Sequence, residues 1–169
     1  MMKKILFSLL ILNLIACSGF QKTSEKMRTE MLKEKALRYY EKINLGEFDE
    51  EYFGLFAEDV EFFYPKYGYD KGREAIKNFG GVIQKLVKSL TFDLDKFVYT
   101  TSENRVVVEI VERGETQSGK KFPNEKTSFG RFCNVFEFNE KGEIKRYYCY
   151  GDPDFAGEDT VRVKLFSKE

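Results

Sequence analysis

The C-terminal part of the sequence holds two aromatic-rich runs joined by a short polar segment, and this pattern limits the possible folds more than any other. The runs cover residues 131–138 and 144–152 and flank Asn139-Glu-Lys-Gly-Glu143. Gly142 can supply the left-handed backbone position that a three-residue hairpin loop needs. We therefore predict an antiparallel hairpin in which Asn139 faces Glu143.

The register of this hairpin decides which side chains share a face. If Asn139 faces Glu143, then Phe138 faces Ile144, and the later pairs are fixed in turn. Because strand side chains alternate, one face is predicted to carry Phe132, Asn134, Phe136, Arg146, Tyr148, Tyr150 and, at the strand end, Asp152. Aromatic rings around a few polar groups are typical of a ligand pocket, so this set forms the candidate ligand-binding residues. The same face would alternatively suit a dimer interface.

The opposite face of the hairpin is predicted to place Cys133 directly across from Cys149. Facing residues of a hydrogen-bonded antiparallel pair have Cα atoms about 5.5 Å apart, a separation that a disulfide accepts. An exported protein also meets oxidants. A disulfide between these residues is therefore one interpretation, and two small, free core residues are the other.

The N-terminal residues have the pattern of an export signal. Two lysines give a positive start, residues 5–15 are apolar apart from one serine and one asparagine, and Ala16 precedes Cys17. The apolar run is shorter than the roughly 20 residues of a membrane-spanning helix, and it resembles a signal peptide that ends in a bacterial lipobox. We predict a lipoprotein signal peptide over residues 1–16, lipidation of Cys17, and a polar tether over residues 17–26.

Lipidation of Cys17 would anchor the protein to a membrane without a spanning helix. Several acyl chains hold a protein stably, at about 0.8 kcal/mol per buried methylene. The expected partner is thus a membrane and the expected location is the bacterial cell envelope. The residue after Cys17 is Ser18 and not aspartate, which favours sorting to the outer membrane if the cell has one. An ordinary secretory signal cleaved nearby is the alternative.

The remaining chain, residues 27–169, is long enough for one domain with its own core. Phenylalanine occurs 17 times and tyrosine 10 times, which favours an aromatic-rich interior. Basic and acidic residues balance at 28 each, so nucleic acid is not an expected partner. Histidine is absent, which rules out imidazole bases, His-containing metal sites and Ser-His-Asp nucleophiles. We expect neither a metal nor a cofactor.

The order of the predicted elements indicates an α+β fold. Apolar side chains at three- and four-residue spacing predict a helix over residues 24–43, and further helices are predicted over 49–56 and 72–87. From there onward the chain is predicted to be antiparallel strand, beginning with a strand over 91–100. Helices first and a meandering sheet after them form an α+β arrangement.

Five segments carry a resemblance to a known family. They are Leu55-Phe-Ala-Glu-Asp-Val-Glu-Phe62, Lys71-Gly-Arg-Glu-Ala-Ile76, Gly114 with Ser118-Gly119, residues 135–144, and Tyr150-Gly-Asp152. In this order they resemble the nuclear transport factor 2-like (NTF2-like) superfamily, and in particular its SnoaL-like polyketide cyclase and ketosteroid isomerase branches. The resemblance implies N-terminal helices packed on a strongly curved antiparallel sheet, which forms a cone with an internal pocket. It also implies homodimers that pair through the sheet.

The resemblance leaves three functions open. The first is binding of a small apolar ligand or a protein partner at the cell envelope. The second is an isomerase, dehydratase or cyclase in which Asp152 is the general base and Tyr148 or Tyr40 donates a hydrogen bond. SnoaL-type cyclases use an aspartate and a histidine as a pair, and this chain has no histidine. The third is a non-catalytic module that assembles as a dimer. Asp152 also has a structural interpretation, because aspartate before Pro153 commonly opens a turn.

Overall fold

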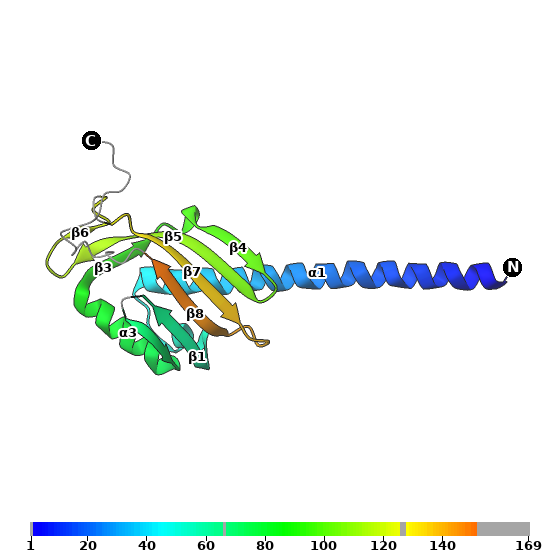
Figure 1. Cartoon of the computed structure of the whole chain (residues 1–169), viewed down its shortest axis with the longest axis horizontal. Helices are drawn as coiled ribbons and strands as arrows, with labels where there is room; N and C mark the ends of the chain where they lie inside the picture. The colour runs from blue at the N-terminus through cyan, green and yellow to red at the C-terminus, as the bar shows by residue number, and fades with distance from the viewer. Residues whose placement is uncertain (1, 66, 126–127, 152–169) are drawn as a thin grey trace.

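The computed structural model describes residues 2–65, 67–125 and 128–151, with side chains from residue 23 onward. Figure 1 shows one long helix, a curved sheet in front of it and a second helix beside the sheet. In chain order the elements are α1 (Met2–Leu45), α2 (Glu50–Gly54), β1 (Phe56–Tyr64), β2 (Gly68–Lys71), α3 (Arg73–Leu86), β3 (Val87–Phe92), η1 (Leu94–Lys96), β4 (Val98–Ser102), β5 (Arg105–Thr116), β6 (Lys121–Phe122), β7 (Arg131–Phe138) and β8 (Ile144–Gly151).

The eight strands form one sheet in the order β2-β1-β8-β7-β5-β3, with β4 and β6 also paired to β5. Most neighbours are antiparallel, but β1 runs parallel to β8. The sheet is therefore mixed rather than purely antiparallel as predicted. The rest of the predicted fold class is confirmed, since this is an α+β chain in which helices pack on a strongly curved sheet.

Strand β5 connects the two parts of the curved sheet. Its first part pairs with β4 and β7, and its last part pairs with β3 and β6. Gly114 lies in the last part, where a Cβ atom would be 2.0 Å from the Ser89 carbonyl oxygen and 2.5 Å from the Phe122 ring. The missing side chain of Gly114 therefore lets β3, β5 and β6 approach one another closely.

Helix α1 builds the core by packing across the concave face of the sheet. Its side chains Leu32, Ala36, Tyr39 and Tyr40 recur at helical spacing and are at most 5% exposed. Tyr39 lies at the centre of an aromatic cluster and contacts the rings of Tyr40, Tyr52, Phe56, Phe136 and Tyr147. The core is thus as rich in aromatic rings as the composition predicted.

Helix α1 is longer than the sequence pattern predicted. It begins at Met2 and ends at Leu45, so residues 17–26, predicted as a tether, are helical. Gly46 follows with a φ of 71°, the left-handed conformation common just after a helix. The N-terminal part of α1 projects beyond the sheet (Figure 1). Within the described ranges, no helix combines the length and apolarity needed to cross a membrane.

The segment predicted as one strand over residues 91–100 is divided in two. Strand β3 ends at Phe92, and η1 separates it from β4. The Asn44 side chain, at the end of α1, donates to the Phe92 carbonyl at 2.9 Å and accepts from the Phe92 N–H at 2.8 Å. The backbone N–H and carbonyl of Phe92 are therefore both hydrogen-bonded to the Asn44 side chain, and the strand ends at this residue.

The hairpin turn forms as predicted, but the register beyond it is wrong by one residue. The first pair beside the turn is as expected, whereas Glu137 then faces Arg146, so that Lys145 forms a bulge. The bulge allows Ile144 and Tyr147, three residues apart, to lie on the same buried face. It also keeps the charged side chains of Lys145 and Arg146 outside. Every later side chain of β8 consequently lies on the face opposite to the prediction.

The same shift separates the two hairpin cysteines. Cys133 faces Tyr150, and Cys149 faces Asn134. The two thiols therefore lie on opposite faces of the hairpin, and both are free. Of the two interpretations of these cysteines, the structure has the free thiols and not the disulfide, and Cys149 is a buried core residue at 2% exposure.

Candidate functional site

A cavity of about 410 Å³ lies between the C-terminal end of α1, helix α3 and the concave face of the sheet. Ile76, Gly80 and Ile83 line it from α3 at three- and four-residue spacing, so one face of this helix borders the cavity. Asn134 on β7 and Tyr147 on β8 line it from the sheet. The internal pocket expected of the cone fold is therefore present.

Aromatic rings make up much of the cavity lining. Within the described part of the chain, the eight rings that contribute are Tyr39, Phe48, Tyr52, Phe62, Tyr64, Phe79, Phe92 and Tyr147. Small-molecule sites in proteins usually occupy about 300 to 1,000 Å³ and combine an apolar wall with a few placed polar groups. The volume and the lining of this cavity both match that description.

Two buried polar side chains interrupt the apolar lining. Glu112 on β5 is 9% exposed, and Asn134 on β7 is 2% exposed. Among the residues that the structure describes, the Glu112 Oε2 atom and the Asn134 Oδ1 atom lack a hydrogen-bond partner. A buried polar atom left unpaired costs about 1 to 3 kcal/mol. A bound molecule that donates to these two atoms would remove that cost.

Burial also changes the acid–base chemistry of Glu112. It raises the pKa of the Glu112 carboxyl from 4.5 to about 8, because the loss of solvent penalises the charged form. The carboxyl is then mostly protonated at neutral pH and can exchange a proton near neutrality. A strongly shifted carboxyl in a cavity is typical of a functional site. In the described part of the chain, no group of three or more metal-ligating side chains is present.

The Asn134 amide is held in one orientation by the core. Its Nδ2 atom donates to the Tyr40 hydroxyl at 2.6 Å, and this leaves Oδ1 as the unpaired end of the amide. Tyr40 is fully buried and contacts the rings of Phe92 and Phe97 edge-on. Tyr40 therefore supports Asn134 and is not itself open to a ligand.

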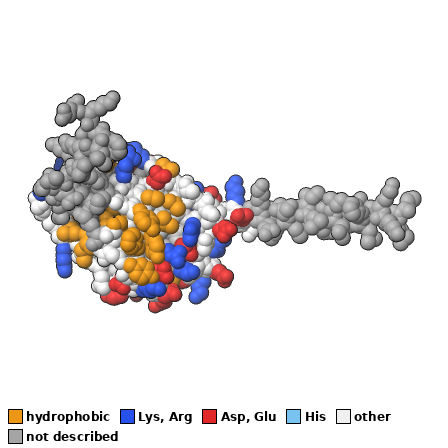
Figure 2. All heavy atoms as spheres, viewed as in Figure 1, with side chains coloured by type: hydrophobic (Ala, Val, Ile, Leu, Met, Phe, Trp, Pro, Cys, Tyr) orange, Lys and Arg blue, Asp and Glu red, His pale blue; other side chains and the backbone are white. Residues whose placement is uncertain are grey.

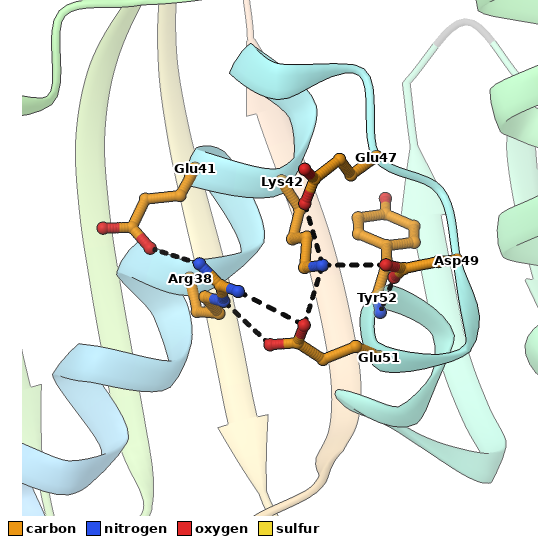
Figure 3. Close-up of polar contacts among 7 residues, drawn as sticks. All are labelled: Arg38, Glu41, Lys42, Glu47, Asp49, Glu51 and Tyr52. Carbon is orange, nitrogen blue, oxygen red and sulfur yellow. Dashed lines mark hydrogen bonds and ion pairs between the residues drawn. The ribbon is translucent and has the colours of Figure 1, made fainter.

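An ion network fixes the rim of the cavity beside α1 (Figure 3). The Lys42 ammonium contacts the carboxylates of Glu47, Asp49 and Glu51 at 3.0, 2.9 and 2.7 Å, although the Lys42 side chain is only 3% exposed. These carboxylates, Glu51 most strongly, hold the pKa of Lys42 above its usual value. The segment that they span includes Phe48, whose ring lines the cavity. The network therefore holds part of the cavity wall in place.

Of the pocket residues predicted on the first hairpin strand, only Asn134 lines the cavity. Phe132 and Phe136 share its concave face but are packed into the core, at 4% and 0% exposure. Tyr40, predicted as a hydrogen-bond donor in catalysis, is buried behind Asn134. Asp152, predicted as the general base, lies outside the described residues.

The bulge in β8 places the three pocket residues predicted on that strand on the outer face of the sheet. Arg146 donates to the carboxylates of Glu61 at 3.1 Å and Glu137 at 2.6 Å, and the Tyr148 hydroxyl donates to Glu61 at 3.2 Å. Tyr150 is 47% exposed. These side chains form a surface cluster and do not contribute to the cavity.

Glu112 is not among the predicted site residues, although the sequence carries a signal for it. Val106, Val108 and Ile110 occupy every second position of β5 and are all buried, so the strand period of two also turns Glu112 inward. Val107 makes the other face of the strand apolar as well. The pattern alone therefore does not show which face of the strand is buried.

No family model and no curated protein matches the sequence, but solved structures do. An NTF2-like protein from Anabaena variabilis is 21% identical over 76% of this chain and 92% of its own length, with a TM-score of 0.61. A provisionally assigned polyketide cyclase from Xanthomonas campestris is 20% identical over 72% of this chain and 90% of its own, with a TM-score of 0.59. TerC, co-crystallised with polyporic acid, is 19% identical over 72% of this chain and 91% of its own, with a TM-score of 0.59.

These similarities confirm that the chain has the NTF2-like fold that the sequence resemblance implied. At 21% identity or less, these similarities show the fold alone, and a fold does not by itself determine a function. The function depends on the side chains that line this particular cavity.

Proposed function

We propose that this chain is a cell-envelope lipoprotein, anchored by lipid on Cys17, whose NTF2-like domain binds a small and mainly apolar ligand. The cavity supports this proposal most directly, since it offers about 410 Å³ of space bordered by aromatic rings. Its two buried polar atoms without partners give a ligand fixed points of attachment. TerC, which shares the fold, was co-crystallised with polyporic acid.

The open cavity argues against a purely structural module. Such a module gains most stability when its own side chains fill the interior at high packing density. Here Phe62 and Phe79 pack against each other, with ring centroids 4.8 Å apart, at the edge of a space that stays open. Space kept open at the expense of packing favours a ligand-binding role.

Uptake of a neutral apolar dye, N-phenyl-1-naphthylamine, tests the proposal. Gly80 borders the cavity, and apart from its chain neighbours and the local helix backbone no atom lies within 4 Å of the place where its Cβ would be. The Gly80→Phe variant should therefore fill the cavity and abolish dye uptake. Gly81 lies off the cavity lining and has equal free space at its Cβ, so Gly81→Phe should take up dye like the wild type. Unchanged uptake by Gly80→Phe would count against a ligand cavity at this site.

Acid–base catalysis in the same cavity is the second candidate function, with Glu112 in place of Asp152. The pKa of the Glu112 carboxyl, about 8, suits a group that gives and takes a proton near neutral pH. If a compound co-purifies, the wild type should convert it with a rate that changes around pH 8. Glu112→Gln should slow the conversion by about 100-fold or more while still binding. No conversion by the wild type would leave binding as the function.

We propose further that two copies pair through the outer face of the sheet. The Phe63 ring contacts those of Tyr148 and Tyr150 there, with centroids 5.7 and 5.8 Å apart, and an Arg146–Glu61 ion pair lies beside them. Figure 2 shows hydrophobic side chains gathered on this face, with charged groups next to them. Apolar rings flanked by fixed charges suit a self-complementary contact.

The long first helix would separate the ligand cavity from the anchor. At 1.5 Å per residue, the helical path from Cys17 to Leu45 is about 40 Å, and the cavity lies at the Leu45 end. A lipid on Cys17 would thus hold the cavity up to that distance from the membrane. Replacing the anchor residue, Cys17→Ser, should move the protein out of the membrane fraction, and an unchanged membrane fraction would contradict lipid anchoring.

A further inference from the structure

The Glu112 carboxyl is buried in the cavity without a counter-charge. Among the described lining residues, only the Lys88 side chain on β3 carries a positive charge. The Lys88 ammonium is bonded to Glu115 at 2.9 Å, and its side chain is 65% exposed. No cation among the described lining residues therefore pairs with Glu112. Buried carboxyls in proteins are normally paired, so this site lacks a partner that a ligand can supply.

The other groups that face Glu112 cannot supply a positive charge. They are the phenol of Tyr40 from α1 and the thiol of Cys149 from β8, and the amide of Asn134 from β7 lines the same cavity. Burial raises the pKa of both the phenol and the thiol well above their usual values, so these two groups remain neutral. The unpaired atom of Asn134 is an oxygen that can only accept a hydrogen bond.

The lining supplies a second kind of attraction for positive charge. Aromatic rings have a negative face, and a cation within about 6 Å of a ring centroid gains roughly 0.5 to 2 kcal/mol. Eight rings border this cavity, among them Tyr147 and Phe92. A buried carboxyl, a buried amide oxygen and several aromatic rings in one cavity together favour a cation that donates hydrogen bonds.

We infer that the ligand of this cavity is a small amine carried on an apolar group, with its ammonium bonded to Glu112 and Asn134 and its apolar part against the aromatic rings. An ammonium group donates three hydrogen bonds, enough to satisfy both unpaired oxygens. This inference rests on the proposed binding function and specifies the ligand class for the same cavity.

Proton linkage gives the inference a distinctive pH dependence. An alkylamine, like lysine, keeps its charge up to about pH 10. The carboxyl of the empty protein has a pKa of about 8, so below that pH it must release a proton before it can pair with an ammonium. The affinity for an amine should therefore fall roughly tenfold for each pH unit below 8. A neutral ligand should show no such fall.

Calorimetric titration with two near-isosteric probes, 4-phenylbutan-1-amine and 4-phenylbutan-1-ol, tests the inference. We expect the amine to bind more tightly than the alcohol at pH 8.5, and its affinity to fall about 100-fold by pH 6 while that of the alcohol stays constant. Glu112→Gln should weaken amine binding at least tenfold at pH 8.5 and spare the alcohol. Glu109→Gln, an exposed carboxylate on the same strand, should behave like the wild type.

The outcomes separate this inference from the proposed function. Equal or tighter binding of the alcohol, or amine binding that Glu112→Gln leaves unchanged, overturns the amine inference but keeps a ligand cavity. Failure of both probes, with normal uptake of N-phenyl-1-naphthylamine, also overturns the amine inference alone. Failure of both probes and of the dye overturns the proposed binding function itself.

Discussion

Glu112 is stable in its cavity as the neutral acid when no ligand is bound. Its carboxyl pKa is raised from 4.5 to about 8 by burial, so between these values the folded chain keeps a proton that the unfolded chain has lost. The contribution of this carboxyl to the free energy of unfolding is therefore fully present below pH 4.5, and it decreases as the pH rises toward 8. At 1.36 kcal/mol per pH unit, the whole decrease is roughly 4 to 5 kcal/mol.

Replacing Glu112 by glutamine should remove this cost. Glu112→Gln is nearly isosteric and cannot ionise, so we expect it to raise the free energy of unfolding by roughly 3 to 5 kcal/mol at pH 8.5 and to change it little at pH 4.5. Urea denaturation at the two pH values measures both effects. Glu109→Gln on the exposed face should change stability by less than about 0.5 kcal/mol at either pH. An equal effect of Glu112→Gln at both pH values would show that burial does not shift this carboxyl.

At the scale of elements, the hairpin shows what the sequence could and could not determine. Turn chemistry predicted the loop, since Asn139 faces Glu143 and Gly142 has a φ of 73°. Both faces of β8 carry aromatic residues, however, with Tyr147 on one face and Tyr148 and Tyr150 on the other, so the alternation along this strand fitted two registers. The bulge at Lys145 forms because Ile144 and Tyr147 both pack into the core. That requirement comes from the helices and strands that make up the core, and the hairpin sequence alone does not contain it.

The corrected register makes a prediction about the two hairpin thiols. Cys149 is 2% exposed, whereas Cys133 on the other face is partly exposed. Iodoacetamide should therefore modify one thiol of the folded, unreduced domain and two after denaturation, as counted by intact mass. A denatured, unreduced domain that takes up no label would mean that the two cysteines are bridged after all.

The junction of α1 and α2 should make the cavity rim sensitive to acid. Lys42 lowers the pKa of Asp49, and Arg38 together with Lys42 lowers that of Glu51. Groups with a lowered pKa in the folded state contribute stability above their usual pKa and lose it as the pH falls through the folded value. The rim should therefore loosen below about pH 4.

Replacing Lys42 tests this dependence. Because three carboxylates lose their shared partner, Lys42→Met should lower the melting temperature at pH 7 and speed ligand release. The melting temperature of this variant should also fall less between pH 5 and pH 3 than that of the wild type. Lys96→Met is the matched control, since the ion pair of Lys96 with Asp93, three residues earlier, is a contact between exposed side chains. Similar effects of both substitutions would show that the Lys42 network does not hold the rim.

At the scale of the whole molecule, the sequence predicted the fold class better than the site. The order of elements and the series of motifs were enough to indicate the NTF2-like fold. The parallel pairing of β1 with β8 was missed because the two strands are far apart in the chain and no local pattern encodes their direction. Of the hairpin residues predicted to line the cavity, Asn134 on β7 does so, whereas those on β8 lie on the outer face because the bulge exchanges the two faces of that strand.

The outer face of the sheet gives a prediction about assembly. We expect the domain to be a dimer in light-scattering measurements after size exclusion. Tyr150→Lys should convert it to a monomer, because a charge would be buried among the outer aromatic rings. Val82→Lys, on the exposed side of α3 and 38% exposed, should leave the dimer intact. A wild-type monomer would contradict pairing through this face.

Native mass spectrometry of the domain from residue 24, purified from an exporting host, tests the ligand cavity most directly. The proposed function predicts a wild-type mass above that of the bare chain, with the excess released on denaturation. The same excess should be present in Gly81→Phe and absent in Gly80→Phe, whose new ring occupies the cavity. A small-molecule mass that stays bound in Gly80→Phe would contradict ligand binding in the cavity between α1, α3 and the sheet.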